Sequence, residues 1–337
     1  MATKPPVEVP QGAIRLNTDS QKLEFFAQDQ WWEMATDVPG ESLNGGSGRG
    51  LVMQGIEPSI VDNISYVDMG STGTSATFGD ATTARRAPAG LGSRTRALSG
   101  GGCTPTVQDN VDYFTFASTG NGTDWGDLDA DRSAMGACAS ATRGLFVGGY
   151  TPSSCNIIEL VTIASTGSAQ DFGDLTSNRW DLTGFASPTR GVFANGTIVA
   201  AGNQVSNIID YVTIATTGNA QDFGDATGVK QANPGCSNST RGLWGGGYTP
   251  SGTSNIDSVY MSTLGNAIDF GDLTTTLTVG AAFSTQTRGV WAAGYSGGNT
   301  NILNMVRFAT EGDAIDYGDL SRSTHRCTGA SNSHGGL

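Results

Sequence analysis

The sequence predicts an all-β fold, a six-bladed β-propeller of four-stranded blades that is closed by its C-terminal strand. Three observations support this prediction. A unit of about 47 residues occurs six times in tandem, each copy contains four strand-like runs divided by turn residues, and the 49 glycines follow no Gly-X-Y period. No helical periodicity is sustained anywhere in the chain. Four strands in each repeat of this length are the sequence signature of propeller blades.

Two landmarks define the repeat and its length. The first is an arginine that begins an apolar run, at Arg49, Arg96, Arg143, Arg190, Arg241 and Arg288. The second is the aspartate that ends a Gly-Asp pair, at Asp80, Asp127, Asp174, Asp225, Asp272 and Asp319. Both series advance by 47 residues, apart from one step of 51 that places four extra residues between Arg190 and Asp225. We assign this insertion to the loop at 195–206.

The third copy illustrates the strands expected in each unit. They lie at about 136–141, 144–147, 157–164 and 171–175, with turn-forming residues between them. The third strand is rich in Ile, Val and Thr, which suit a pleated, half-buried surface. The same four-strand pattern is expected in the other copies.

The two ends of the chain are expected to meet in the first blade. Residues 331–337 align with 284–290, so the chain continues into one more first strand after the sixth Gly-Asp pair. We therefore expect about 326–333 to supply the innermost strand of the first blade, which would leave no free sheet edge at the junction. The sequence divides into an N-terminal attachment segment with a β-hairpin, 1–40, and the propeller, 41–337.

Composition limits the possible partners. The formal net charge of −13, from 18 basic and 31 acidic residues, argues against general binding to nucleic acid or to an anionic membrane surface. No run approaches the roughly 18 apolar residues of a membrane span, and the first ten residues lack the apolar core of a signal peptide. Synthesis in a cytoplasm is therefore expected. The five cysteines lack paired spacing, so we predict no disulfide framework, no metal site and no cofactor.

Features that recur in every blade are expected to support the fold. The repeated Asp-x-Gly-Asp carboxylates would lie on opposite faces of a regular strand and would not clamp an ion, unless a bulge at the glycine changes this. For the six landmark arginines we expect hydrogen bonds or ion pairs between blades; the alternative is a ring of arginines that binds an anionic ligand. Cys138 and Cys236 occupy core positions of the innermost strand. The only two histidines are His325 and His334, and we predict no catalytic residues.

The Gly-Gly pair that closes the second strand resembles the kelch type of propeller. It occurs at Gly101-Gly102, Gly148-Gly149 and Gly246-Gly247, and an aromatic residue follows later in the unit. The regularly spaced Tyr and Trp of kelch repeats are absent, so the resemblance implies a shared architecture rather than membership.

Residues 12–34 are similar to a segment of tail fibres and other appendage proteins of tailed bacteriophages. The matching positions are Gly12, Ile14, Arg15, Asn17, Thr18, Leu23, Glu24, Phe25 or Phe26, and Trp31 or Trp32. Asp29-Gln30 stands where that segment usually has a glycine before the tryptophan. The Asp-Phe-Gly-Asp and Thr-Arg-Gly signatures also resemble repeats in virion proteins of phages of marine cyanobacteria. The two resemblances imply a structural or host-binding protein of the virion, such as a tail fibre, an appendage or a capsid decoration, oligomeric in the particle.

The same N-terminal segment reads as three short strands. Because isolated small hairpins are marginal, the aromatic side chains of Phe25, Phe26, Trp31 and Trp32 need a partner surface. We predict that this surface belongs to another virion protein. The alternative is that the segment packs on the side of its own propeller.

Side chains that break the repeat are the better candidates for ligand binding. The loops between second and third strands share one face of the ring with the connections between blades. We predict that this face combines cations and aromatic rings, namely Arg85, Arg132, Arg179 and Lys230 with Tyr150, Tyr248 and Tyr295. Aromatic faces stack on sugars and cations bind acidic groups, which would suit a glycan or protein of the host surface. The alternative is a set of solvated loop residues without a ligand.

Three functions follow from these patterns. The first is a non-catalytic virion protein whose propeller contacts a host surface or a neighbouring subunit. The second is a structural spacer in the particle. The third is a propeller glycoside hydrolase or sialidase that acts on host glycans, but no Ser-x-Asp-x-Gly-x-x-Trp box is present.

Overall fold

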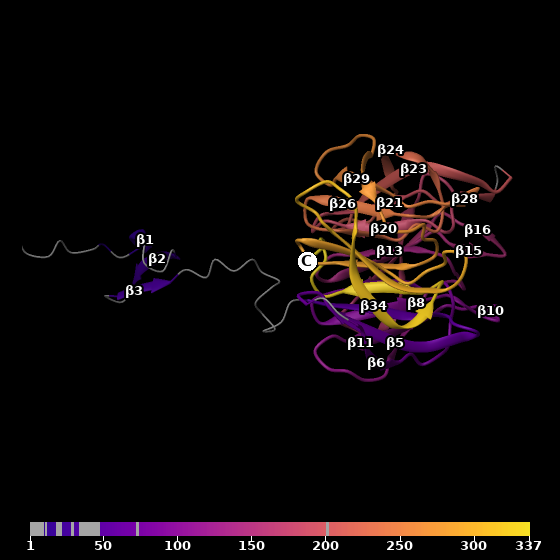
Figure 1. Ribbon diagram of the computed structural model, residues 1–337, viewed down its shortest axis with the longest axis horizontal. Coiled ribbons are helices and arrows are strands. Elements are labelled where there is room, and N and C mark those ends of the chain that lie inside the picture. The colour runs from indigo at the N-terminus through magenta and orange to yellow at the C-terminus, as the bar shows by residue number, and fades with distance from the viewer. Residues whose placement is uncertain are drawn as a thin grey trace, which may run out of the picture.

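The computed structural model describes residues 10, 12–17, 22–27, 30–33, 48–71, 74–199 and 202–337. The described chain is all-β, and six antiparallel blades of four strands form a ring, as predicted (Figure 1). Among these residues no helix is long and apolar enough to cross a membrane. The proposed boundary at residue 40 lies outside the described residues.

Each blade runs outward from the central channel through four strands. From the inside outward, the first blade consists of β35 (Thr328–Ser331), β4 (Arg49–Ile56), β5 (Ile60–Asp68) and β6 (Ala76–Asp80), and the second of β7 (Ala89–Gly92), β8 (Arg96–Gly100), β11 (Asn110–Thr115) and β12 (Thr123–Asp127). The third consists of β13 (Gly136–Ala139), β14 (Arg143–Val147), β17 (Ile157–Thr162) and β19 (Gln170–Asp174), and the fourth of β20 (Thr183–Ala186), β21 (Arg190–Ala194), β23 (Gln204–Thr213) and β24 (Gln221–Lys230). The fifth consists of β25 (Gly235–Ser237), β26 (Arg241–Gly245), β29 (Asn255–Tyr260) and β30 (Ile268–Asp272), and the sixth of β31 (Ala281–Ser284), β32 (Arg288–Ala292), β33 (Thr300–Arg307) and β34 (Ile315–Thr324). The third-blade strands agree with their expected positions to within about two residues.

The ring closes through the C-terminal strand, as the repeat alignment predicted. β35 pairs antiparallel with β4, and Ala330 lies opposite Leu51. The innermost strand of the first blade thus comes from the end of the chain, and the other three come from its beginning. In Figure 1 the yellow C-terminal strands accordingly lie against the indigo strands of the first blade.

The hydrophobic core is divided among the spaces between neighbouring blades. Six clusters of buried side chains fill the six spaces, one in each. Between the second and third blades, for example, Leu91 and Trp125 pack with Phe146 and Ile163. Cys138 and Cys236 are buried in two of these clusters, as expected. Because no blade can bury its faces alone, the stability of the ring depends on every blade being in place.

The outer strand of a blade is held by a turn of the next blade. In the fourth blade, for example, the backbone N–H groups of Gly265 and Ala267, from the next turn, donate to the carbonyl oxygens of Phe223 and Asp225. Each described outer strand also contains a β-bulge at the aromatic residue before the repeated glycine, so strict alternation does not hold there. The aromatic ring is buried, and the edge strand has partners on both sides.

The repeated glycine of the Gly-Asp pair is required by this contact. At Gly224 φ is +145°, and a Cβ atom would lie 2.5 Å from the carbonyl oxygen of Gly265. We expect Gly224→Ala to lower the free energy of unfolding by about 2–4 kcal/mol, through the clash and the backbone strain together. Gly228→Ala is the matched control, because Gly228 lies in the same strand with no atom near its Cβ position. Chemical denaturation measures the free energy of unfolding of both variants. Equal small losses of stability would show that the turn at Gly265 shifts to accommodate the added methyl group.

The two faces of the ring differ in what they carry. We call one the hairpin face, because it bears the small hairpins β9 (Cys103–Thr104) with β10 (Thr106–Val107), β15 (Tyr150–Thr151) with β16 (Ser153–Ser154), and β27 (Tyr248–Thr249) with β28 (Ser251–Gly252). The equivalent loop of the fourth blade pairs β22 (Thr197–Ile198) with β23, and it contains the four-residue insertion, as predicted. Figure 1 shows β10, β15, β16 and β28 on one side of the ring and the C-terminus on the other.

The C-terminal face holds both ends of the propeller. A Cβ atom at Gly48, near the first described residues of the ring, would clash with the side chain of Ser333. The residues after Ser333 lie across the channel: His334 Nε2 is 2.6 Å from the carbonyl oxygen of Gly92, and the N–H of Gly335 donates to Ser237 O at 2.8 Å. These partners belong to the second and fifth blades, so the C-terminal tail covers this end of the channel.

Candidate ligand site at the mouth of the central channel

The four cations that we expected on the hairpin face are buried instead. The side chains of Arg85, Arg132 and Arg179 are 0% exposed and that of Lys230 is 5% exposed. Each forms an ion pair with an acid on the third strand of the blade that follows it in sequence. The pairs are Arg85–Asp112, Arg132–Glu159 and Arg179–Asp210, all at 2.5 Å, and Lys230–Asp257 at 3.0 Å. Side chains enclosed in this way do not face a ligand, and the expectation of an exposed cationic ring was wrong on this point.

These cations hold the second and third strands together. Nη1 of Arg179 donates to the carbonyl oxygens of Asn195 and Ile208, while Nη2 reaches Asp210. Burial lowers the pKa of Arg179, and the charge of Asp210 opposes that effect. In the third blade burial raises the pKa of Glu159, against the attraction of Arg132. The ion pairs therefore offset the cost of removing both charges from water.

The two blades without a cation at this position also lack the acid. In the sixth blade Leu277 stands in place of the cation and Asn304 in place of the acid, and both are buried. In the first blade the corresponding residues are Thr324 and Ser65. There the guanidinium of Arg322 donates to the strand carbonyl oxygens instead, at Gln54 and Asn63. This co-occurrence of cation and acid was present in the sequence as a signal for buried pairs.

The six landmark arginines form the contacts between blades that we expected. Each donates to a backbone carbonyl of the following blade, and the last closes the ring. The acceptors of Arg49, Arg96, Arg143, Arg190, Arg241 and Arg288 are the carbonyl oxygens of Phe116, Ile163, Ile214, Met261, Phe308 and Met69. These arginines belong to the structure of the ring.

A belt of backbone hydrogen bonds surrounds the channel where it opens on the hairpin face. A single residue, two or three positions before each innermost strand, contributes its N–H and its carbonyl, and six hydrogen bonds of 2.7–2.9 Å close the circle. The residues are Ala87, Ala134, Asp181, Ala232, Val279 and Arg326, all with φ between 49° and 56°. Non-glycine residues seldom adopt this left-handed conformation, so the belt imposes an unusual backbone at six places.

Two members of the belt carry charge and break its symmetry. Asp181 precedes the fourth blade and Arg326 precedes the first, so they lie on opposite sides of the six-bladed ring. Among the described residues, neither side chain has a hydrogen-bond or ion-pair partner. Burial raises the pKa of Asp181 to about 6, and Arg326 lowers it in part. An unpaired acid and an unpaired base thus share the mouth.

The belt encloses a cavity of about 120 Å³. Asp181, Asn233 and Arg326 line it, together with backbone and small side chains of the innermost strands. Asn233 is 2% exposed; its Nδ2 donates to Asn195 Oδ1 at 2.8 Å, but its Oδ1 has no hydrogen-bond partner. The amide of Asn233 is directed at Asn195, and its Cβ atom lies near Gly247, so this side chain packs between the blades. The polar side chains that set the chemistry of the cavity are therefore those of Asp181 and Arg326.

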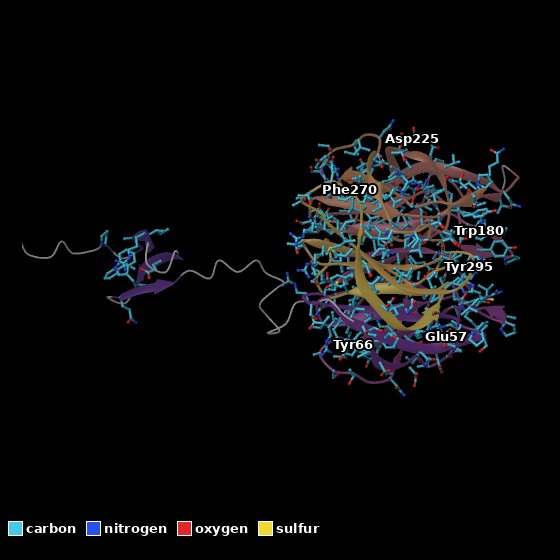
Figure 2. All side chains as sticks on the ribbon, viewed as in Figure 1. Glu57, Tyr66, Trp180, Asp225, Phe270 and Tyr295 are labelled. Atoms are coloured by element: carbon cyan, nitrogen blue, oxygen red, sulfur yellow. The ribbon has the colours of Figure 1, made fainter. Side chains whose placement is uncertain are left out.

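Aromatic side chains stand around the mouth. The rings of Tyr150 and Trp180 lie 5.7 Å apart, and those of Tyr295 and His325 also lie 5.7 Å apart. Trp180 and His325 directly precede the two charged members of the belt. Figure 2 shows Trp180 and Tyr295 on the side of the ring that carries the hairpins. Burial and the neighbouring Arg326 lower the pKa of His325, so the ring is neutral at pH 7.

The three predicted tyrosines are exposed, as expected for ligand contacts. Tyr150, Tyr248 and Tyr295 are 38%, 45% and 46% exposed. Sequence reasoning missed Asp181 and Arg326, although each replaces a small or apolar residue that the other blades share. Comparison of this one position across the six copies would have identified both.

The N-terminal residues form a separate three-stranded sheet, as expected. β2 (Lys22–Ala27) pairs with β1 (Ile14–Asn17) and with β3 (Gln30–Glu33). The Phe26 and Trp31 rings contact edge to face at 5.3 Å, and the Arg15 guanidinium lies 4.1 Å from the Trp31 ring centroid. Phe25 lies opposite Trp32 in the pairing; the placement of their side chains falls outside the described residues. Figure 1 draws this sheet apart from the ring.

In the part of the chain that the structure describes, no three His, Cys, Asp or Glu side chains gather as metal ligands would. The candidate site is the channel mouth, with Asp181, Arg326 and the aromatic rim. Neither a model of a known protein family nor a curated protein matches the sequence.

Proposed function

We propose that the chain is a non-catalytic binding protein of a virus particle. Its N-terminal segment is the mount on another virion protein, and the hairpin face contacts a host-surface glycan or protein, or a neighbouring subunit. The observation that carries this proposal is the difference between the faces. Charged and aromatic departures from the repeat gather at the mouth on the hairpin face, while the C-terminal tail covers the channel on the opposite face.

The virion part of the proposal draws on the sequence. The similarity of residues 12–34 to appendage segments of tailed bacteriophages supports a mount there. The sheet formed by these residues presents Trp31 and Phe26 side by side, and such small sheets seldom persist without a partner surface. We expect the chain to be oligomeric in the particle through this segment.

The chemistry of the mouth supports binding over catalysis. Hydrolysis of a glycosidic bond uses two carboxyl groups about 5–10 Å apart. Of the residues that line the cavity, Asp181 alone carries a carboxyl group. A glycoside hydrolase or sialidase remains the alternative proposal, and it would need a second carboxylate elsewhere on the hairpin face.

Binding of the labelled full-length chain to a glycan array and to candidate bacterial hosts tests the proposal. We expect saturable binding that falls at least about 10-fold in the Tyr150→Ala/Tyr295→Ala variant, because buried aromatic contacts carry much of the energy of an interface. Tyr260→Ala is the control, since Tyr260 is 50% exposed at the far end of its strand. Loss of binding in both variants, or no binding by folded protein, would contradict the proposal. Release of sugar from the array would favour the hydrolase.

A further inference from the structure

We infer that the channel mouth binds a compact zwitterion, a small molecule or chain end that carries one ammonium group and one carboxylate. The inference rests on the proposed binding role of the hairpin face and names the chemistry that this face would recognise. It follows from two oppositely charged side chains that line the same cavity, Asp181 and Arg326, neither of which forms a hydrogen bond or an ion pair within the described residues.

The positive end of the ligand is assigned to the side of Asp181. Of the residues that line the cavity, Asp181 is the acid, and its carboxylate only accepts hydrogen bonds when it is ionised. An ammonium group donates three hydrogen bonds and carries the opposite charge to Asp181, so it is the matching partner.

The negative end is assigned to Arg326 across the mouth. A guanidinium group presents paired N–H donors that match the two oxygens of a carboxylate. Of the residues that line the cavity, Arg326 alone carries a positive charge. Because Asp181 and Arg326 form no ion pair with each other in the described structure, their charges stay available for a ligand that spans them.

The size of the cavity limits the ligand to a compact one. About 120 Å³ accommodates about four water molecules, at roughly 30 Å³ each, or one small organic molecule. Larger ligands would place only their charged end in the mouth and rest the remainder on the aromatic rim. The closest members of that rim are Trp180 and His325, each adjacent in sequence to one of the charged residues.

The probe is β-alanine, titrated into the full-length protein by calorimetry or by ligand-observed NMR. Propanoate lacks its ammonium group and ethylammonium lacks its carboxylate, so the two are matched probes. We expect each to bind at least about 10-fold more weakly than β-alanine, since a charged hydrogen bond contributes about 1.5–3 kcal/mol. Equal binding of all three, or no binding of β-alanine, would overturn the inference. This comparison uses the unchanged protein, so it does not depend on the folding of any variant.

Two substitutions locate the site. Asp181→Asn and Arg326→Gln are each expected to weaken β-alanine binding at least about 10-fold, with partial recovery in Arg326→Lys. The controls are Asp131→Asn and Arg307→Gln, which change the same charges at exposed residues outside the cavity lining. Equal losses in variants and controls, or unchanged binding in Asp181→Asn and Arg326→Gln, would place the ligand elsewhere.

The pH dependence provides an independent arm. β-Alanine keeps both charges across about pH 5–7. The pKa of Asp181 is about 6, and Arg326 is the other charged group that lines the cavity. Affinity is therefore expected to rise with pH through about 6 as Asp181 ionises, and to lose this dependence in Asp181→Asn. If host cells bind but β-alanine does not, the ligand assignment fails while the proposed function stands; if β-alanine binds and no host does, the reverse holds.

Discussion

Removal of residues 326–337 is expected to abolish the cooperative unfolding transition of the ring. The deletion takes away β35, which pairs with β4 through four residues, and it breaks the belt of hydrogen bonds at Arg326. It also exposes the buried side chains of Leu51 and Met53, whose cluster includes Ala330. The combined loss exceeds about 5 kcal/mol, which is comparable to the whole stability of an ordinary domain.

The control for this deletion is a shorter one, of residues 335–337. It removes the backbone bond from Gly335 to Ser237 but leaves β35 and the belt intact. We expect the shorter deletion to keep a single transition with a modestly lower midpoint. Thermal unfolding followed by circular dichroism distinguishes the two. A cooperative transition of near-native midpoint in the longer deletion would show that the ring does not rely on closure by its C-terminal strand.

Asp210→Asn is expected to destabilise the protein by about 3–5 kcal/mol. The substitution leaves the guanidinium of Arg179 completely buried with no counter-charge, and breaking a buried ion pair on one side costs about this much. The hydrogen bond from Thr176 Oγ1 to Asp210, at 2.7 Å, would survive with an amide oxygen in its place. The stability lost in Asp210→Asn therefore reflects the unpaired charge of Arg179 and not the loss of the hydrogen bond from Thr176.

The double variant Arg179→Leu/Asp210→Asn is the matched control. It gives the fourth blade the residue types that occupy the equivalent buried positions of the sixth blade, Leu277 and Asn304. Asn304 there accepts a hydrogen bond from the Thr274 hydroxyl, just as Asp210 does from Thr176. We expect the double variant to regain most of the stability and to lie within about 1–2 kcal/mol of the natural chain. Chemical denaturation decides the point, and a double variant no more stable than Asp210→Asn would contradict this account of the pairs.

The fold could be predicted because a repeat fixes many positions at once. The constant spacing of Arg96, Arg143 and their equivalents assigns every blade, and the alignment of 331–337 with 284–290 predicts the closing strand. The bulge at the aromatic before Gly224 was not predicted, because bulges depend on backbone contacts with the next blade rather than on side-chain alternation.

The candidate site was predicted only in part. The exposed tyrosines were identified, since loop lengths and turn residues show which segments reach the hairpin face. Arg132 and Arg179 were misplaced, because the position of a cation within the repeat was considered without the acid that accompanies it, and only the pair indicates burial. Asp181 was missed because its neighbours in sequence give no sign of a channel; the belt that places it opposite Arg326 exists only in the closed ring.

A crystal structure of the full-length protein with β-alanine would show whether the channel mouth holds a zwitterion. We expect the ligand in the mouth of the channel on the hairpin face, with its ammonium group at Asp181 and its carboxylate at Arg326. A mouth filled only with water, in crystals of protein that binds β-alanine in solution, would contradict this expectation. The recognition site would then lie elsewhere on the propeller.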